Sequence, residues 1–177
     1  DRATTFARWM EDAGLVATYK HFPGLGRVTD NTDTVAGVTD AVTTRSGDPA
    51  VSVFADAITG GARVIMVSSA IYSLIDSSAP AVFSSVDVTD MLRGDLGFKG
   101  VVITDDVSAA VQVQDRTPAQ RAVQAVRAGC DIVLASADAT VVADMARALV
   151  TEAQSDPALA ERVDESAARV LALKNGS

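Results

Sequence analysis

The chain has 177 residues, 48% of them hydrophobic, and a mean hydropathy of +0.21, so it can bury a sizeable core in one domain and is not a disordered segment. Its 23 acidic and 15 basic residues give a formal charge of −8, and no Lys/Arg cluster exceeds a pair, which argues against a nucleic-acid-binding surface. The single cysteine, Cys130, excludes an intrachain disulfide and lies in an apolar run typical of a buried thiol.

Amphipathic stretches alternate with compact apolar runs along the chain. The stretches with helical periodicity are, in chain order, residues 4–14, 50–62, 85–98, 117–129, 138–154 and 157–174. The apolar runs predicted to be strands are residues 15–21, 63–69, 100–106 and 131–136. Near-continuous Val/Ile runs separated by helices are typical of a parallel sheet covered on both faces, so the predicted fold class is α/β with parallel (β/α) units.

Several helix boundaries are marked by the residue types that favour them. Thr117, followed by Pro118 and then Gln120, has the pattern of a capping box at a helix start, and Gly129 marks the end of the same helix. Gly14 is expected to end the first helix, and Asp156 before a proline is expected to begin the last one.

Polar side chains follow the predicted strands at the point where each strand ends. They are His21, Ser68, Ser69, Asp105, Asp106, Ser136 and Asp138. The carboxyl ends of parallel strands carry the active site in α/β folds, so these side chains are expected to converge. Two architectures fit the pattern: a small doubly wound sheet with a small-molecule site, or part of a (β/α) barrel. Because a whole barrel needs about 250 residues and eight strands, four units would be about half of one.

Four blocks of sequence point to one known family. They are "KHFPGLGRVTDNTD" from residue 20, "VIMVSSAIYSLIDSSAPAVFSS" from residue 64, "MLRGDLGFKGVVITDDVSAA" from residue 91 and "AVRAGCDIVLAS" from residue 125. In this order they resemble the N-terminal barrel domain of glycoside hydrolase family 3, and within it the β-N-acetylhexosaminidases. The resemblance implies that residues 1–177 form one domain, a partial TIM-type barrel with about four of the eight units and equivalent to its second half.

The resemblance also implies a chemistry, that of a retaining glycosidase acting on terminal β-linked N-acetylglucosamine or a related β-hexoside. Asp105 matches the family's nucleophile, and Lys20 and His21 match residues that hydrogen-bond the sugar. Ser69 stands where the family has a further histidine, and we expect it to line the substrate site. Since adjacent strand residues point opposite ways, only one of Asp105 and Asp106 can face the pocket.

The chain departs from the family at the proton donor. Leu25 and Asp33 stand where the hexosaminidases have histidines, and Asn31 stands where their Asp-x-His dyad has its aspartate. Two alternatives follow. Either Asp33, or its neighbour Asp30, is the acid/base, or the protein is an inactive relative that binds sugar. The loop has few apolar residues, so we expect it to be mobile and to bring Asp33 towards Asp105 when sugar binds.

The remaining expectations concern cofactors, partners and compartment. The family's chemistry needs neither a cofactor nor a metal, and the expected small-molecule partner is a carbohydrate. An incomplete barrel is expected to pair with an N-terminal half-barrel or a second chain. No apolar stretch approaches the ~20 residues of a membrane span. Family relatives leave the compartment open between secreted, cell-envelope and cytoplasmic locations.

Overall fold

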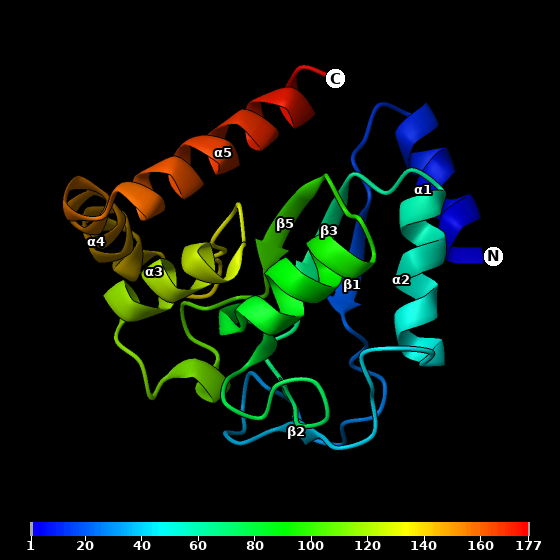
Figure 1. Cartoon of the computed structure of the whole chain (residues 1–177), viewed down its shortest axis with the longest axis horizontal. Helices are drawn as coiled ribbons and strands as arrows, with labels where there is room; N and C mark the ends of the chain where they lie inside the picture. The colour runs from blue at the N-terminus through cyan, green and yellow to red at the C-terminus, as the bar shows by residue number, and fades with distance from the viewer. Residues whose placement is uncertain (1, 177) are drawn as a thin grey trace.

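The computed structural model describes residues 2–176 and has an α/β architecture around a three-stranded sheet (Figure 1). The strands of this sheet are β1 (Thr18–Phe22), β3 (Val64–Val67) and β5 (Val101–Thr104), and a second, two-stranded sheet pairs β2 (Thr39–Asp40) with β4 (Ile71–Tyr72). The α-helices are α1 (Arg2–Asp12), α2 (Pro49–Thr59), α3 (Pro118–Ala128), α4 (Val142–Ser155) and α5 (Pro157–Lys174). Shorter or irregular helices are η1 (Ala81–Phe83), the π-helix η2 (Val86–Asp95), η3 (Val111–Val113) and η4 (Ala139–Val141).

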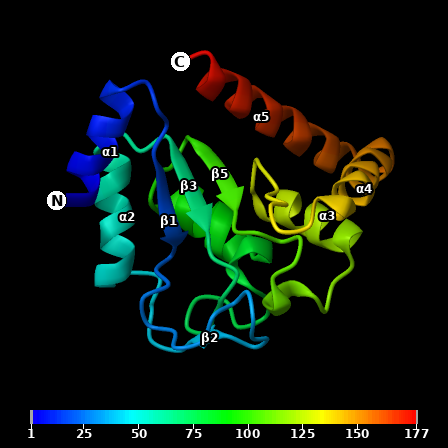
Figure 2. The ribbon, with the colours of Figure 1, turned by 180° about the vertical axis from the view of Figure 1, so that it is seen from behind.

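The main sheet is parallel and follows the order of the sequence, β1-β3-β5. Val64 lies opposite Val101, and the pairing continues in register to Val67 opposite Thr104. An order that never reverses is that of a barrel wall, whereas a doubly wound sheet changes direction at a switch point. All three strands point towards the loops that carry β2, as Figure 2 shows, so their carboxyl ends share one edge.

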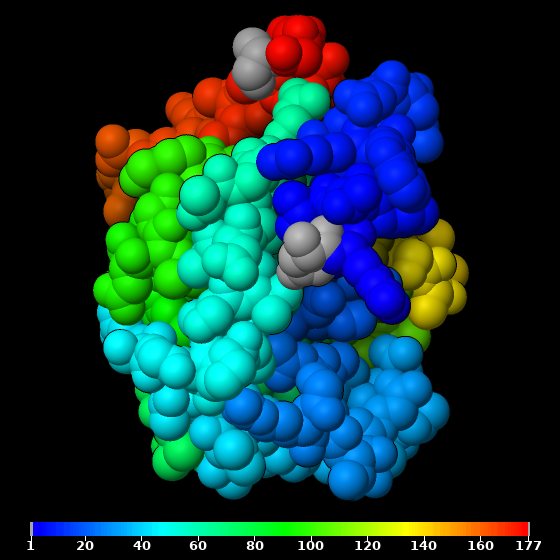
Figure 3. Space-filling model, turned by 90° about the vertical axis from the view of Figure 1, so that its right-hand side faces the viewer, coloured from blue at the N-terminus to red at the C-terminus, as the bar shows by residue number. Residues whose placement is uncertain are grey.

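Helices flank the main sheet at both edges, and η2 lies across one of its faces, behind the strands in Figure 2. The side chains of Ile65, Val67 and Val102 are fully buried. Helices α1 and α2 lie beside β1, and α3 to α5 lie beyond β5 (Figures 1 and 2). Figure 3 shows α1 and α2 side by side on the outer face, above the loop that follows β1. Within residues 2–176, no helix combines the length and apolar character needed to cross a bilayer.

The helix boundaries follow the capping residues of the sequence. Thr117 and Gln120 form both hydrogen bonds of the capping box of α3, and Gly129 ends that helix with a left-handed φ of 119°. The Asp156 carboxylate caps α5 by accepting from the amides of its first turn. These predictions are confirmed, and α1 ends two residues before Gly14.

The fourth predicted strand, residues 131–136, is not a regular strand, so that prediction was wrong. It runs beside β5 but forms one parallel bridge, between Ile103 and Ile132. Hydrogen bonds to the backbone and side chain of Thr104 hold it at Ile132 and Leu134. Within residues 2–176, no strand pairs with the other edge of this segment. It therefore lacks the second row of backbone hydrogen bonds that gives an interior strand its regular geometry.

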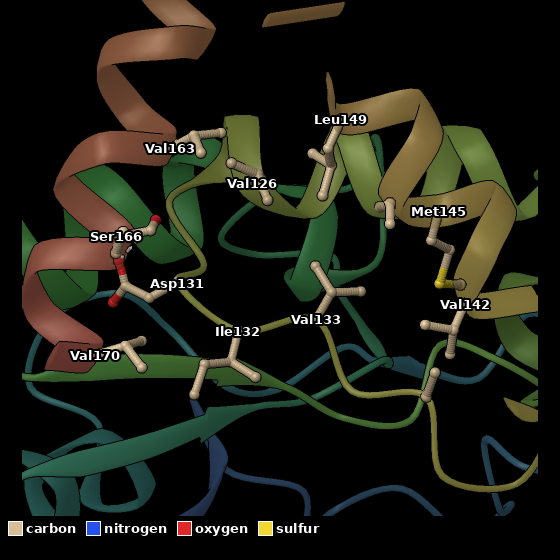
Figure 4. A pocket seen from close by; sticks show the side chains of 14 residues that line it. Val126, Asp131, Ile132, Val133, Val142, Met145, Leu149, Val163, Ser166 and Val170 are labelled. Carbon is tan, nitrogen blue, oxygen red and sulfur yellow. Dashed lines mark hydrogen bonds between the residues drawn. The ribbon is translucent and has the colours of Figure 1, made fainter. Parts of the chain in front are cut away.

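A hollow of about 420 Å³ separates this segment from the helices that follow it. Figure 4 shows Ile132 and Val133 with Met145 and Leu149 of α4 and Val163 of α5 around it, while the Ser166 hydroxyl donates to Asp131 at one end. Its walls are almost entirely apolar, and it lies apart from the polar strand ends. The hollow therefore reflects incomplete packing around residues 131–135 rather than a site for chemistry.

Two further features were not predicted. Residues 86–95 are helical as expected, but as a π-helix, and the β2–β4 sheet has only two residues in each strand. Hydrophobic periodicity could predict neither feature. Strands of two residues are too short to show an alternation of apolar and polar residues. A helix of ten residues presents a similar apolar face whether its hydrogen bonds follow the α or the π pattern.

Candidate active site

Strand β1 delivers Lys20 and His21 to the polar edge of the sheet. Lys20 is exposed, and the peptide bonds Lys20–His21 and Phe22–Pro23 are both cis. The turn that follows approaches α2 so closely that a Cβ on Gly24 would lie 2.7 Å from the Cβ of Ala50, and Gly24 has a φ of 137°. Only glycine fits this position without strain, so the "PG" pair fixes the turn that begins the next loop.

Strand β5 delivers Asp105 to the same edge. The Asp105 amide donates to the Val67 carbonyl of β3 at 2.9 Å, and its Oδ1 accepts from the Asp106 amide. The Asp105 Oδ2 lies 3.9 Å from Nε2 of His21, and 19% of the Asp105 side chain is exposed. The carboxylate is thus held by the amide of the next residue and remains reachable by a ligand.

The surroundings of His21 shift the pKa of its imidazole. Burial lowers its pKa below the usual value and the Lys20 cation lowers it further, while the carboxylates of Asp105 and Asp33 act in the opposite direction. Because the lowering effects dominate, the imidazole is neutral at pH 7 and can both donate and accept a hydrogen bond. Asp105 therefore faces a neutral partner at His21.

Asp106 has a different environment from its neighbour. Its Oδ1 accepts from the amide and hydroxyl of Ser108, and its Oδ2 accepts from the amides of Ser136 and Ala137 and the hydroxyl of Ser136. Burial opposes ionisation, but these hydrogen bonds outweigh it and hold the pKa of Asp106 well below its usual range. Asp106 therefore ties the end of β5 to the loop at residues 136–137.

Ser69 lies just past the end of β3, two residues after the carbonyl that binds Asp105. Its side chain is fully buried, and its hydroxyl has no hydrogen-bond partner among the residues that the structure describes. Buried hydroxyls are normally paired, so Ser69 offers an unused donor and acceptor at this edge.

The loop after β1 places Asp33 near the same cluster, close enough for its charge to act on His21. Its side chain is exposed, its amide donates to the Asn31 side chain, and its carbonyl accepts from the Val111 amide at 3.1 Å. The loop is anchored at more points than its composition suggests. Thr32 and Val38 are buried, and hydrogen bonds attach the loop to residues 111–112.

Gln112, which makes part of that attachment, was not predicted from the sequence. It lies 74 residues from its partner Val38, between Val111 and Val113, in a stretch without a recognisable motif. In the described part of the chain, no cluster of three or more His, Cys, Asp and Glu side chains is arranged to hold a metal ion.

A second unusual carboxyl group lies outside this cluster. Asp87 of η2 is completely buried, and neither carboxyl oxygen has a hydrogen-bond partner among the described residues. Burial raises the pKa of Asp87 to about 7, and the charge of Asp76 adds to the effect. The group is therefore largely protonated below neutral pH.

This raised pKa predicts a pH dependence of stability. The folded protein holds the Asp87 proton to higher pH than the unfolded chain, so the stabilisation is complete below about pH 4 and is lost as pH rises to 7. With about 1.4 kcal/mol for each pKa unit, the loss amounts to about 4 kcal/mol. Urea unfolding of wild type and Asp87→Asn between pH 4 and 8 should show the variant gaining relative stability as pH rises. The exposed Asp90→Asn on the same helix is the control, and parallel curves for wild type and Asp87→Asn would refute the prediction.

Almost the whole chain is similar to known proteins in both sequence and structure. The family model described as "Glycosyl hydrolase family 3 N terminal domain" matches residues 1–173. A solved β-N-acetylhexosaminidase from Beutenbergia cavernae is 55% identical, with a TM-score of 0.96 over 97% of this chain and 51% of that chain.

Two curated relatives are similar over large parts of the sequence. A "Beta-hexosaminidase" from Psychromonas ingrahamii is 39% identical over 77% of this chain and 40% of its own length. An "Uncharacterized secreted glycosyl hydrolase" from Arthroderma benhamiae is 35% identical over 97% of this chain and 50% of its own length. The chain thus spans half or less of the curated relatives that it matches here.

Proposed function

The chain belongs to glycosyl hydrolase family 3, as an N-terminal domain of that family, and from this premise we propose that the protein is a retaining glycosidase. The substrate class is terminal β-linked N-acetylglucosamine or a related β-hexoside. The observation that carries the proposal is the meeting of Asp105 with a neutral His21 at the carboxyl edge of the sheet, 3.9 Å apart. The names of the relatives favour this activity over the alternative of an inactive sugar-binding protein.

In this proposal each residue near the strand ends has a separate role in the reaction. The Asp105 carboxylate attacks the anomeric carbon while Asp33 protonates the departing glycosidic oxygen, giving a glycosyl-enzyme ester. Asp33 then takes a proton from water, which attacks the same carbon and releases Asp105. Lys20 and His21 hydrogen-bond the sugar hydroxyls, while Ser69, whose hydroxyl is fully buried, lines the same edge without reaching the ligand.

Asp33→Ala tests the acid/base role. Leaving groups that need protonation should lose about 10²- to 10³-fold in kcat/KM, because that is the usual contribution of a general acid. An activated aryl β-glycoside should lose less than about tenfold, and azide should restore turnover by attacking the glycosyl-enzyme without needing a base. Steady-state kinetics with both substrate types, with and without azide, measure this.

Asp30→Ala is the matched control, because Asp30 is the other exposed carboxylate of the same loop and the alternative acid/base. If Asp30→Ala shows the leaving-group dependence and azide rescue instead, the role moves to Asp30. Equal loss on both substrates in Asp33→Ala, without rescue, would assign Asp33 to the solvated surface of the loop.

We also propose that residues 1–177 form a single domain equivalent to the second half of the family's barrel, completed by an N-terminal half-barrel or a second chain. Two features support this proposal. Strand β1 has a free edge, and beside it Trp9 of α1 is 67% exposed and Phe6 61% exposed. At the other edge, residues 131–135 are only half-buried next to their apolar hollow. Apolar edges of this kind are normally covered in a native assembly.

A further inference from the structure

Four hydrogen bonds join the Asp33 loop to the segment that follows Asp105. Two of them run between backbones, from the Gln112 amide to the Thr32 carbonyl at 3.0 Å and from the Val111 amide to the Asp33 carbonyl at 3.1 Å. The other two come from one side chain. The Gln112 Oε1 accepts from the Val38 amide at 2.9 Å, and its Nε2 donates to the Val38 carbonyl at 3.2 Å.

The Gln112 amide thus pairs with both backbone groups of Val38, as a neighbouring strand would, and the Val38 carbonyl also accepts from the Ile71 amide of β4 at 3.0 Å. Only 5% of Gln112 is exposed, and Thr32 and Val38 are each 4% exposed. A buried donor or acceptor that is left unpaired lowers the stability of the fold by about 1–3 kcal/mol. The geometry that pairs all of these groups is therefore strongly preferred. The bonds at Thr32 and Val38 bracket Asp33, which leaves only its side chain free to move.

The other end of the connection is also fixed. The Asp106 carboxylate binds the Ser108 and Ala109 amides, and Arg121 of α3 donates to the carbonyls of Val107 and Ser108. The segment that follows Asp105 is therefore held by hydrogen bonds at residues 106–109, and at residues 111–112 it is bonded to the Asp33 loop. This segment and the Gln112 side chain together connect the backbone at Asp33 to the backbone at Asp105 through a chain of hydrogen bonds.

We propose that Gln112 is a positioning residue that sets the separation of the Asp33 and Asp105 carboxylates. The inference rests on the proposed function, in which Asp33 is the acid/base and Asp105 the nucleophile. Gln112 touches neither substrate nor reacting atoms. The separation matters because retaining glycosidases need their two carboxyl groups about 5–5.5 Å apart, and a misplacement of about 1 Å can cost 10²-fold in rate.

Gln112→Met tests the proposal in the intact protein, because it keeps the length of the side chain and removes both bonds to Val38. We expect kcat/KM to fall about 10- to 100-fold on a substrate with a poor leaving group and less than about 3-fold on an activated aryl glycoside. The loss should lie in kcat, since Gln112 makes no contact with the sugar. Gln154→Met is the matched control. Gln154 is an exposed glutamine of α4, away from the Asp33 loop and from residues 105–112, and we expect changes below about 2-fold on both substrates.

Gln112→Glu supplies a pH-dependent rescue, which a purely structural role would show equally on both substrates and a positioning role mainly on the substrate with a poor leaving group. Ionised, its carboxylate opposes the Val38 carbonyl. Protonated, it donates to that carbonyl and accepts from the Val38 amide, as glutamine does. Its activity relative to wild type at the same pH should therefore match that of Gln112→Met at pH 8 and recover several-fold towards pH 5. This variant carries the test at low pH if Gln112→Met does not fold.

The outcomes separate the inference from the proposed function. If Asp33→Ala shows leaving-group dependence and the Gln112 variants lose activity equally on both substrates, or only melt at a lower temperature, Gln112 is structural and the inference is overturned. If Asp33→Ala shows no leaving-group dependence, the acid/base assignment fails and the positioning role fails with it. Leaving-group dependence in both Asp33→Ala and Gln112→Met, with pH rescue in Gln112→Glu, supports the inference.

Discussion

Replacing Asp105 by asparagine should lower kcat by about 10⁴-fold or more on every glycoside that the intact protein hydrolyses. The amide is almost the same size as the carboxylate, and its oxygen can still accept from the Asp106 amide, so the end of β5 keeps its shape. What is lost is the charge that attacks the anomeric carbon. An amide oxygen is a poor nucleophile, and the adjacent Asp106 carboxylate cannot replace it, because it is engaged by residues 108 and 136–137.

The matched control is Asp115→Asn, a change at an exposed carboxylate that pairs only with its neighbour Arg116 in the structure. It should retain activity within about 2-fold, and both variants should unfold at nearly the wild-type urea concentration. Mass spectrometry with a 2-fluoro sugar provides a second measurement, since the wild type should form a covalent adduct at Asp105. Turnover at the wild-type rate in Asp105→Asn would remove this residue from the mechanism.

The sequence was sufficient to predict the three strands of the main sheet and the edge at which His21 and Asp105 meet. Apolar runs at residues 63–69 and 100–106 contain β3 and β5, because buried parallel strands are composed of little else. Once three parallel strands follow one another, their carboxyl ends must share an edge, so His21 and Asp105 meet although they are far apart in the chain.

The features that could not be predicted depend on partners distant in sequence. Residues 131–136 have a strand-like composition, yet regular strand geometry requires a ladder on each side of an interior strand, and this segment has one bridge. The contact between Gln112 and Val38 joins a glutamine to a backbone 74 residues away, and nothing local distinguishes that glutamine from its exposed neighbour Gln114. Local patterns specify elements, while such contacts set how the loops sit between them.

The largest effect on stability is expected at Asp131, at the opposite end of β5 from Asp105. Its carboxylate is completely buried and accepts from Arg93 of η2 and from Arg162 and Arg169 of α5. It also accepts from the Val102 amide at 2.9 Å and from the Ser166 hydroxyl at 3.1 Å. One negative charge thus holds three guanidinium groups, and with them α5, against the sheet.

Asp131→Asn keeps the size of this group and removes its charge. The free energy of unfolding should fall by about 3–5 kcal/mol, because three partly buried cations then face one another without a counter-charge. Urea unfolding measures this, with Asp144→Asn as the control: Asp144 pairs with Arg147 at the surface, where such a pair is worth at most about 1 kcal/mol. Since Asp131 touches the start of β5 and none of the strand-end residues, kcat per folded molecule should stay near the wild-type value. A loss below about 1 kcal/mol would mean that the guanidinium groups find other carboxylates, such as Glu165, which already lies 3.1 Å from Arg162.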